Sequence, residues 1–304
     1  MEHLRPIFNA ELADFESGYV RLAGGEIVFG GRGWAPGDLL QAFAPQVYED
    51  LFTRWAADRR RRLIERADEI LAQYGQADRF EMLRAALGRG LVSPFVGAGM
   101  SMPSEYPGWT AFLYRVRGRT TIPEQHLTDL LGRGEYELAA QELADALGPA
   151  FDQEVDEAFG LARELRGPVQ IIPRVFDAPV ATTNFDNVLQ RCYARCGRGF
   201  EDVITGADAA ELRRLLGRGQ RVLVKVHGSV AAGRGRVLTA REYDAVYQNG
   251  AIAHVVEALS ARTLLFLGCR LTIDRLLTAF GDYAATEGHR AVVQHYAFLA
   301  ADSD

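Results

Sequence analysis

The residues that could do chemistry in this sequence gather in four short motifs, each directly after an apolar run. The first is Gly97-Ala98-Gly99-Met100-Ser101, which follows residues 91–96. Glycines let a backbone approach a pyrophosphate closely, and the helix start that follows offers free N–H groups to it. The third glycine of the dinucleotide fingerprint is absent at the expected spacing. An unliganded strand-to-helix turn is therefore the alternative.

The second motif is Thr182-Thr183-Asn184-Phe185-Asp186. Asn184 and Asp186 can present an amide and a carboxylate into one crevice at the end of a strand. The alternative is that one of them caps the helix that follows.

The third motif is Lys225-Val226-His227-Gly228-Ser229. A histidine that ends an apolar strand and precedes glycine lies where a general base would have backbone room around it. A structural histidine is the alternative. Lys225 is the only lysine of the chain. Strand alternation puts it on the face opposite to Val224 and Val226, and we assign it no role.

The fourth motif, Leu265 to Leu271, is another strand that ends in a glycine turn, at Gly268-Cys269.

The elements that must position all four motifs alternate along the chain. Besides 91–96, strands are expected at 179–183, 221–226, 263–267 and 291–299, and helices at 187–196, 207–216, 251–261 and 274–285. This order predicts an α/β fold with a Rossmann-like, mainly parallel sheet whose ligands bind at the carboxyl ends of the strands.

Two further blocks surround this sheet. Residues 110–167 look helical and are too long for one crossover, so we expect a helical insertion that is either a lid or a packing element. Residues 1–88 form an N-terminal, mostly helical extension with helices at 46–73 and 77–87. The domain boundaries are thus 1–88 and 89–304. Four arginines, Arg59 to Arg62, lie within the longer helix, as a solvated face or as an assembly surface.

The composition limits which partners and cofactors the protein is expected to bind. The net charge is −6, which argues against a generally basic, nucleic-acid-binding surface. Three cysteines are too few for a disulfide framework or a four-cysteine zinc site, so we expect a cytoplasmic protein without a metal. No apolar run is long enough to span a membrane.

In this order and spacing the four motifs resemble the sirtuin-like family of NAD-dependent proteins, over about residues 91–299. The resemblance implies that NAD+ is the ligand. It implies catalytic roles for Asn184, at the nicotinamide ribose, and for His227, the general base. The cofactor-binding residues would be Gly97, Ala98, Gly99, Ser101, Thr183, Asp186, Gly268 and Cys269.

The sequence departs from the protein deacylases of the family. Cys192 and Cys196 have no second cysteine pair, so the zinc ribbon is missing, and Tyr106-Pro107-Gly108 replaces a Pro-Asp-Phe-Arg-like segment. Arg270 replaces a small polar residue. These features resemble sirtuin-like domains of bacterial antiphage defence, which destroy NAD+ in abortive infection.

The resemblance therefore implies an NAD+ hydrolase that releases nicotinamide and ADP-ribose. It also implies a homo-oligomer, with a partner such as a HerA-type ATPase or an Argonaute. The alternatives are a deacylase or ADP-ribosyltransferase, and a non-catalytic NAD-sensing module that gates a partner effector. Because residues 300–304 directly follow the last expected strand, we expect the domain to be incomplete at its C-terminus.

Overall fold

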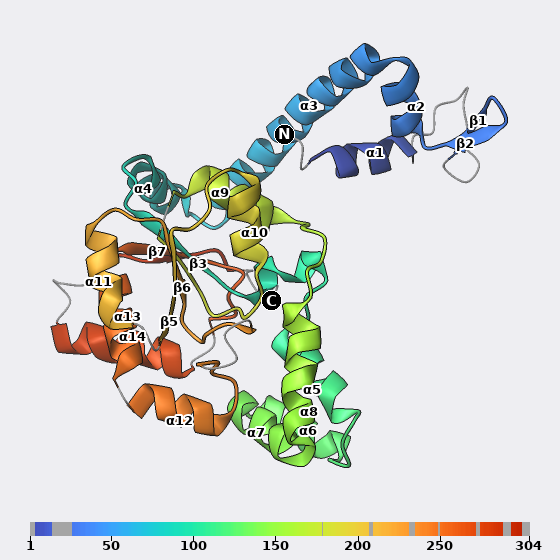
Figure 1. Ribbon diagram of the computed structural model, residues 1–304. Helices are drawn as coiled ribbons and strands as arrows, with labels where there is room; N and C mark the ends of the chain where they lie inside the picture. Colours follow the sequence, from blue (N-terminus) through green and yellow to red (C-terminus); the bar gives the residue numbers. More distant parts are fainter. Residues whose placement is uncertain are drawn as a thin grey trace. The chain divides into compact units, whose positions relative to one another are not determined.

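The computed structural model (Figure 1) describes residues 4–13, 26–177, 179–206, 209–230, 235–248, 250–271, 274–287 and 293–299. Two compact units make up the chain, Met1–Met82 and Leu83–Asp304.

The first unit is built on one long helix. Its elements are α1 (Arg5–Ala13), β1 (Ile27–Phe29), β2 (Arg32–Trp34), α2 (Pro36–Phe43) and α3 (Pro45–Gln73), with the start of α4 (Ala77–Gly88). Phe8 of α1 packs against Tyr48 and Phe52 in the first half of α3. The second half, residues 60–70, is exposed. The extension is thus mostly helical, as expected, but it also holds the antiparallel β1–β2 hairpin.

Two of the four arginines Arg59 to Arg62 of α3 form ion pairs with acidic side chains. Arg59 bonds Glu11 of α1 at 3.0 Å, and Arg61 bonds Asp58 at 2.9 Å. Arg59 therefore helps to hold α1 on α3.

The second unit is a six-stranded, all-parallel sheet in the order β5-β6-β4-β3-β7-β8. The strands are β3 (Val92–Val96), β4 (Val180–Thr182), β5 (Asp202–Thr205), β6 (Val222–Lys225), β7 (Thr263–Leu267) and β8 (Tyr296–Ala297). Parallel strands buried on both faces need continuous apolar runs, and β3 and β6 are buried at every position. The predicted Rossmann-like α/β fold is confirmed.

Helices cover both faces of the sheet (Figure 1). Those between β3 and β4 are α5 (Trp109–Arg117), α6 (Glu124–Gly132), α7 (Tyr136–Leu147), α8 (Pro149–Val155) and α9 (Ile172–Val175). The later ones are α10 (Val188–Arg195), α11 (Ala209–Gly217), α12 (Ala240–Gln248), α13 (Ala251–Ser260) and α14 (Arg275–Glu287). The core on one face joins the helical insertion and α10, and the core on the other joins α11, α13 and α14.

Three elements of this unit were missed from the sequence, namely α9, β5 and α12. The sheet edge β5 has a half-buried pattern with an acidic first residue, which hides it among loops. Parts of two expected elements, residues 207–208 and 291–292, and the terminal segment 300–304 lie outside the described residues.

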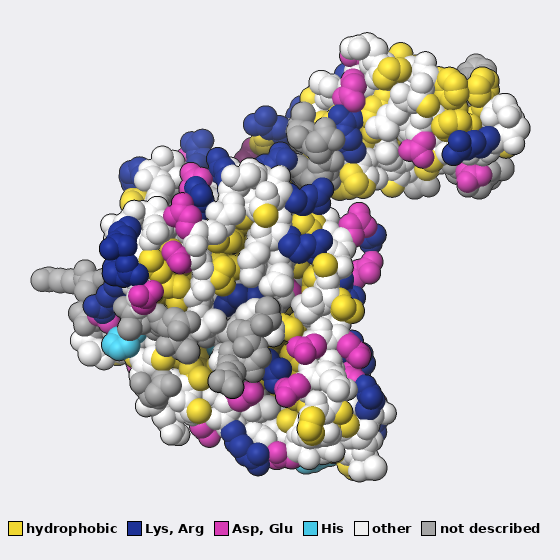
Figure 2. Space-filling model, in the orientation of Figure 1, with side chains coloured by type: hydrophobic (Ala, Val, Ile, Leu, Met, Phe, Trp, Pro, Cys, Tyr) yellow, Lys and Arg dark blue, Asp and Glu magenta, His cyan; other side chains and the backbone are white. Residues whose placement is uncertain are grey.

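The surface carries both signs of charge. On the face that Figure 2 shows, basic and acidic side chains are interspersed.

Candidate functional site

All four motifs leave the sheet from one row of residues. Val96 of β3 pairs with Thr182 of β4 on one side and with Leu267 of β7 on the other, and Thr182 pairs with Lys225 of β6. Each motif loop therefore starts at the same height at the carboxyl edge of the sheet. Because the connections after β3 and β7 run to opposite sides of the sheet, this edge has the switch-point geometry at which α/β folds bind ligands.

The glycines of the first and fourth motifs pack against each other. A Cβ at Gly97 would lie 2.5 Å from the carbonyl oxygen of Gly268, and one at Gly99 would lie 2.9 Å from it. Gly268 itself has a φ of 65° and accepts a hydrogen bond from the Gly99 N–H at 3.0 Å. These glycines are therefore required by backbone contact, whether or not a phosphate lies over them.

Cys269 belongs to the same contact. Its thiol donates to the carbonyl oxygen of Phe95 at 3.5 Å, and burial raises its pKa to about 12. The thiol thus stays protonated at neutral pH.

A narrow cleft opens between the first two motif loops and the helical insertion. Five predicted site residues line it, together with aromatic and proline neighbours: Ala98, Ser101, Thr183, Asn184 and Asp186, with Tyr106, Pro107, Trp109, Phe159 and Phe185. Its free volume is about 20 Å³, room for roughly one water molecule. His227, Gly97, Gly99, Gly268 and Cys269 are described but do not line this cleft.

Asn184 is held from two sides. Its side-chain amide donates to the Ser101 hydroxyl at 3.2 Å, and its backbone N–H donates to Thr182 Oγ1 at 3.0 Å. Thr182 Oγ1 in turn donates to the Val96 carbonyl at 2.7 Å. The first two motifs are thereby joined by hydrogen bonds, a role for Thr182 that sequence reasoning missed.

Asp186 combines both roles considered from the sequence. Its Oδ1 accepts a hydrogen bond from the Val188 N–H at 2.9 Å, at the start of α10, and its side chain also lines the cleft. Burial raises the pKa of this carboxyl, against the opposing effects of the Val188 N–H, the Ser101 hydroxyl and the Lys225 ammonium.

His227 lies between two tyrosines of α12. Its Nε2 is 3.2 Å from the Tyr247 hydroxyl and its Nδ1 is 3.4 Å from the Tyr243 hydroxyl. Burial lowers the imidazole pKa to about 4, so the ring is neutral at pH 7. A neutral imidazole has one donor and one acceptor nitrogen, and the two hydroxyls satisfy both. Gly228 has a φ of 80° and leaves room for the Gly235 carbonyl.

A local signal for α12 was present in the sequence. Thr239 and Glu242 form a capping box, in which Glu242 Oε2 accepts from the Leu238 and Thr239 N–H groups at 2.9 and 2.8 Å. The Glu242 N–H lies 3.4 Å from Thr239 Oγ1. Reading this box would have found the helix that supplies the His227 partners.

The helical insertion is fastened to the elements that carry the later motifs. Arg241 of α12 bonds Asp145 of α7 through two contacts of 3.1 Å, and Arg275 of α14 bonds Glu137 of α7 at 2.8 Å. Arg270, within the fourth motif, donates to the Tyr136 hydroxyl at 2.9 Å. Arg270 therefore contacts the insertion, a partner that the sequence did not indicate.

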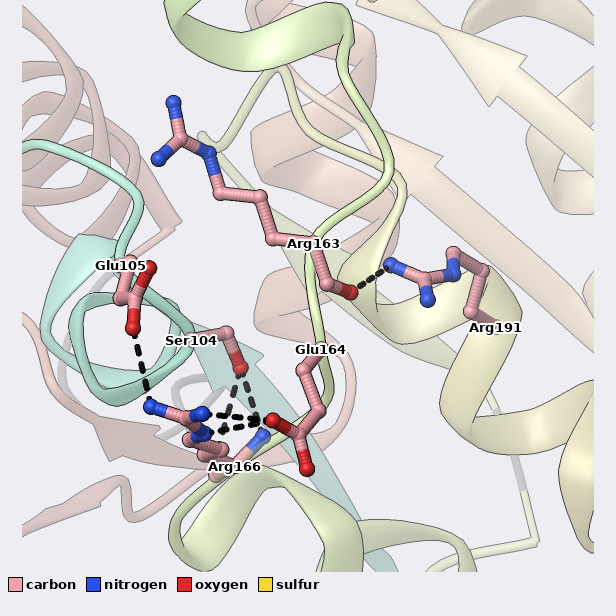
Figure 3. A network of polar contacts seen from close by, with 6 residues as sticks. All are labelled: Ser104, Glu105, Arg163, Glu164, Arg166 and Arg191. Carbon is pink, nitrogen blue, oxygen red and sulfur yellow. Dashed lines mark hydrogen bonds and ion pairs between the residues drawn. The ribbon is translucent and has the colours of Figure 1, made fainter.

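The segment that leaves the insertion is bonded to the residues that directly follow the first motif (Figure 3). The Arg166 N–H donates to Ser104 Oγ at 2.9 Å, and its guanidinium bonds Glu105 at 2.9 Å. Arg191 of α10 donates to the Arg163 carbonyl at 2.5 Å. The C-terminal end of the insertion is thus held both by the segment after the first motif and by α10.

Lys225 differs from the expectation that gave it no role. Alternation along β6 does turn it away from the Val224 face, but its Nζ is fully buried beneath the second motif. It donates to the Phe185 and Asp186 carbonyls at 2.8 and 2.7 Å.

Among the described residues, no group of three or more His, Cys, Asp or Glu side chains is placed to hold a metal ion. Cys192 is buried in α10 and Cys196 is exposed, and both are free thiols. In the same part of the chain, no helix combines the length and apolarity that crossing a membrane requires.

Comparison with known families agrees with the motifs. Residues 179–304 match the family model of the SIR2-like domain, a range that contains Asn184, His227 and Gly268. The Gly97–Ser101 loop precedes this range but belongs to the same sheet. No curated protein gives a match to the chain. The match supports an NAD-related function of the sirtuin type. Residues 179–304 of this chain are therefore similar to a SIR2-like domain.

Proposed function

We propose that this chain is an NAD+ hydrolase that releases nicotinamide and ADP-ribose. The observation that carries the proposal is the cleft in which Ala98 and Ser101 from one loop meet Thr183, Asn184 and Asp186 from the next. A buried amide with a fixed orientation suits the binding of ribose hydroxyls and of a water molecule.

The reaction makes modest demands on acid catalysis. The bond between C1′ of the ribose and the pyridinium nitrogen breaks, and nicotinamide leaves as a neutral molecule with the electron pair of that bond. Water then adds to C1′ and loses one proton. The site must therefore stabilise an oxocarbenium-like centre and deliver water to one face, which is the role proposed for Asn184.

His227 is proposed to accept that proton, or one from a ribose hydroxyl. Its lowered pKa keeps an unprotonated nitrogen at neutral pH. That nitrogen must exchange its tyrosine partner for the substrate, because both ring nitrogens are bonded to hydroxyls of α12.

Substrate entry requires the cleft to widen, since a dinucleotide is far larger than the free volume of about 20 Å³. Trp109 and Phe159 of the insertion line the cleft, whereas Leu113 and Leu143 pack in the core. We propose that the insertion is both a lid and a packing element.

The test measures nicotinamide release from NAD+ by the purified chain with and without an acylated peptide. Asn184→Ala should lower kcat by about 100-fold or more, and His227→Ala by about 10- to 100-fold. Asn187→Ala is the matched control, because the Asn187 side chain, directly before α10, accepts a hydrogen bond from the Gln190 amide at 3.1 Å and does not line the cleft.

Other outcomes would reject the hydrolase. Release that depends on the acylated peptide would indicate a deacylase. Binding of NAD+ without release, by the chain alone and with candidate partners, would favour the NAD-sensing module.

The wider biological role is also a proposal. We propose that the chain acts in the cytoplasm as an antiphage effector that depletes NAD+ and that it is controlled by assembly. The exposed half of α3 supports this, because Leu63 and Ile64 there are 59% and 50% exposed. Apolar side chains on an exposed helix are typical of an interface.

Oligomer size tests the assembly surface. Leu63→Glu with Ile64→Glu should dissociate the assembly in light scattering, whereas Leu138→Glu on α7, which is 41% exposed, should not. A wild-type chain that is monomeric at micromolar concentration would contradict the proposal. If the N-terminal segment is deleted instead, the deletion should end before α4, because Leu83 and Ala86 of this helix belong to the core of the second unit.

A further inference from the structure

The only lysine of the chain lies at the junction of two motif loops. Lys225 is 0% exposed, and its Nζ has three hydrogen-bond partners. Two are the carbonyl oxygens of Phe185 and Asp186, at 2.8 and 2.7 Å, and the third is Ser229 Oγ at 3.3 Å. An ammonium group has three protons, so each has its own acceptor.

These acceptors belong to the loops that follow two neighbouring strands. Phe185 and Asp186 follow Asn184 after β4, and Ser229 follows His227 after β6. The Lys225 side chain thus joins the backbone of the loop after β4 to a side chain of the loop after β6. Burying a charge without partners is strongly unfavourable, so the position of Nζ is well defined only while both loops keep their present geometry.

We propose that Lys225 is a positioning residue that holds the Asn184 loop and the His227 loop in register. The inference rests on the proposed function only in naming Asn184 and His227 as the groups to be positioned. The hydrogen bonds of Lys225 Nζ go to two backbone carbonyls and to Ser229, so it acts on Asn184 and His227 through the loops that carry them. The nearby Asp186 carboxylate favours the charged form of the lysine, whereas burial lowers its pKa to about 8.

The experiment compares Lys225→Met with Arg262→Met in the full chain. Arg262 is a control because it is a partly buried cation, bonded to Ser93 Oγ at 2.7 Å, that lies at the amino edge of the same sheet, away from the motif loops. Hydrogen–deuterium exchange should rise about tenfold in residues 183–188 and 226–230 of Lys225→Met and stay unchanged there in Arg262→Met. In nicotinamide release, Lys225→Met should lower kcat about 100-fold with a KM change below about threefold.

Two results would overturn the proposal. One is unchanged exchange in both loops, and the other is an equal rise in both variants across the whole sheet, which would make Lys225 a general core residue. If the wild-type chain releases no nicotinamide, the hydrolase proposal fails while the exchange result still decides the role of Lys225. If Lys225→Met does not fold, Ser229→Ala replaces it, because this variant keeps the ammonium and removes one acceptor. It should raise exchange in residues 226–230, and unchanged exchange there would overturn the proposal.

Discussion

The Asn184 side-chain amide donates a hydrogen bond of 3.2 Å to the Ser101 hydroxyl, across two loops that are 83 residues apart in sequence. Both side chains are buried, and both line the same cleft. Ser101 therefore fixes the direction in which the amide presents its oxygen and its second N–H to a ligand.

Ser101→Ala should weaken this orientation without removing the amide. A neutral hydrogen bond is worth about 1 kcal/mol, so we expect kcat for nicotinamide release to fall about three- to tenfold. Steady-state kinetics would check this value, with Ser104→Ala as the control, because Ser104 bonds the Arg166 backbone instead. A loss as large as that of Asn184→Ala would contradict a purely orienting role.

His227 should make the fold sensitive to acid. Its pKa is about 4 in the fold and about 6.5 in an unfolded chain, so between these values the unfolded state binds more protons. Stability from this group is therefore present above pH 6.5 and is lost as the pH falls towards 4. The free energy of unfolding should be about 2 kcal/mol lower at pH 5 than at pH 7 because of this group.

Urea unfolding of the wild type and of His227→Gln at both pH values measures this difference. The variant should lose correspondingly less stability on acidification, whereas His254→Gln, at an exposed imidazole, should behave like the wild type. Because the imidazole is already neutral there, protonation of His227 should not lower kcat/KM between pH 8 and pH 6. If the free energy of unfolding changed equally with pH in His227→Gln and in the wild type, the imidazole would not be desolvated in the fold.

Gly97→Ala separates backbone packing from phosphate binding. The added methyl group would lie 2.5 Å from the Gly268 carbonyl oxygen, so we expect a loss of about 2 kcal/mol or more in urea unfolding without any ligand. Gly132→Ala is the control, since nothing lies within 4 Å of a Cβ at that helix end. Unchanged stability with weaker NAD+ binding would instead assign Gly97 to the ligand alone.

The ion pairs between α7 and α12 should control how easily the insertion opens. Arg241→Ala removes the two contacts with Asp145 and should speed NAD+ association about threefold, with a stability change below about 1 kcal/mol. Stopped-flow binding would measure this. High salt should give the wild type the same faster rate, because these side chains are exposed. Arg133→Ala, which breaks only a pair with Glu135 nearby in sequence, should have no effect.

Much of the sheet could be predicted because its central strands are short apolar runs next to glycine turns. The residues 91–96 and 263–267 appear as β3 and β7 within one residue of their expected ends. The edge strand β5 was missed because an edge position imposes no continuous apolar pattern. The cleft residues of the first two motifs could be predicted because each motif directly follows one of these short apolar runs.

The contacts of His227 and Lys225 could not be predicted in the same way. Alternation assigned Lys225 to the correct face, but its three acceptors depend on how two loops turn after their strands. The tyrosines at His227 come from a helix 16 to 20 residues later in the chain. Such contacts depend on tertiary structure, and local spacing carries no record of them.

The buried position of the only lysine also determines when a lysine-specific protease can act. Within residues 1–304, a lysyl endopeptidase has one cleavage site, after Lys225, and cutting there gives residues 1–225 and 226–304. Since Lys225 is fully buried in β6, that bond is open to the protease only when β6 separates from its neighbours in the sheet. The rate at which this single pair of fragments forms thus measures how often the sheet opens at Lys225, which joins the Asn184 loop to the His227 loop.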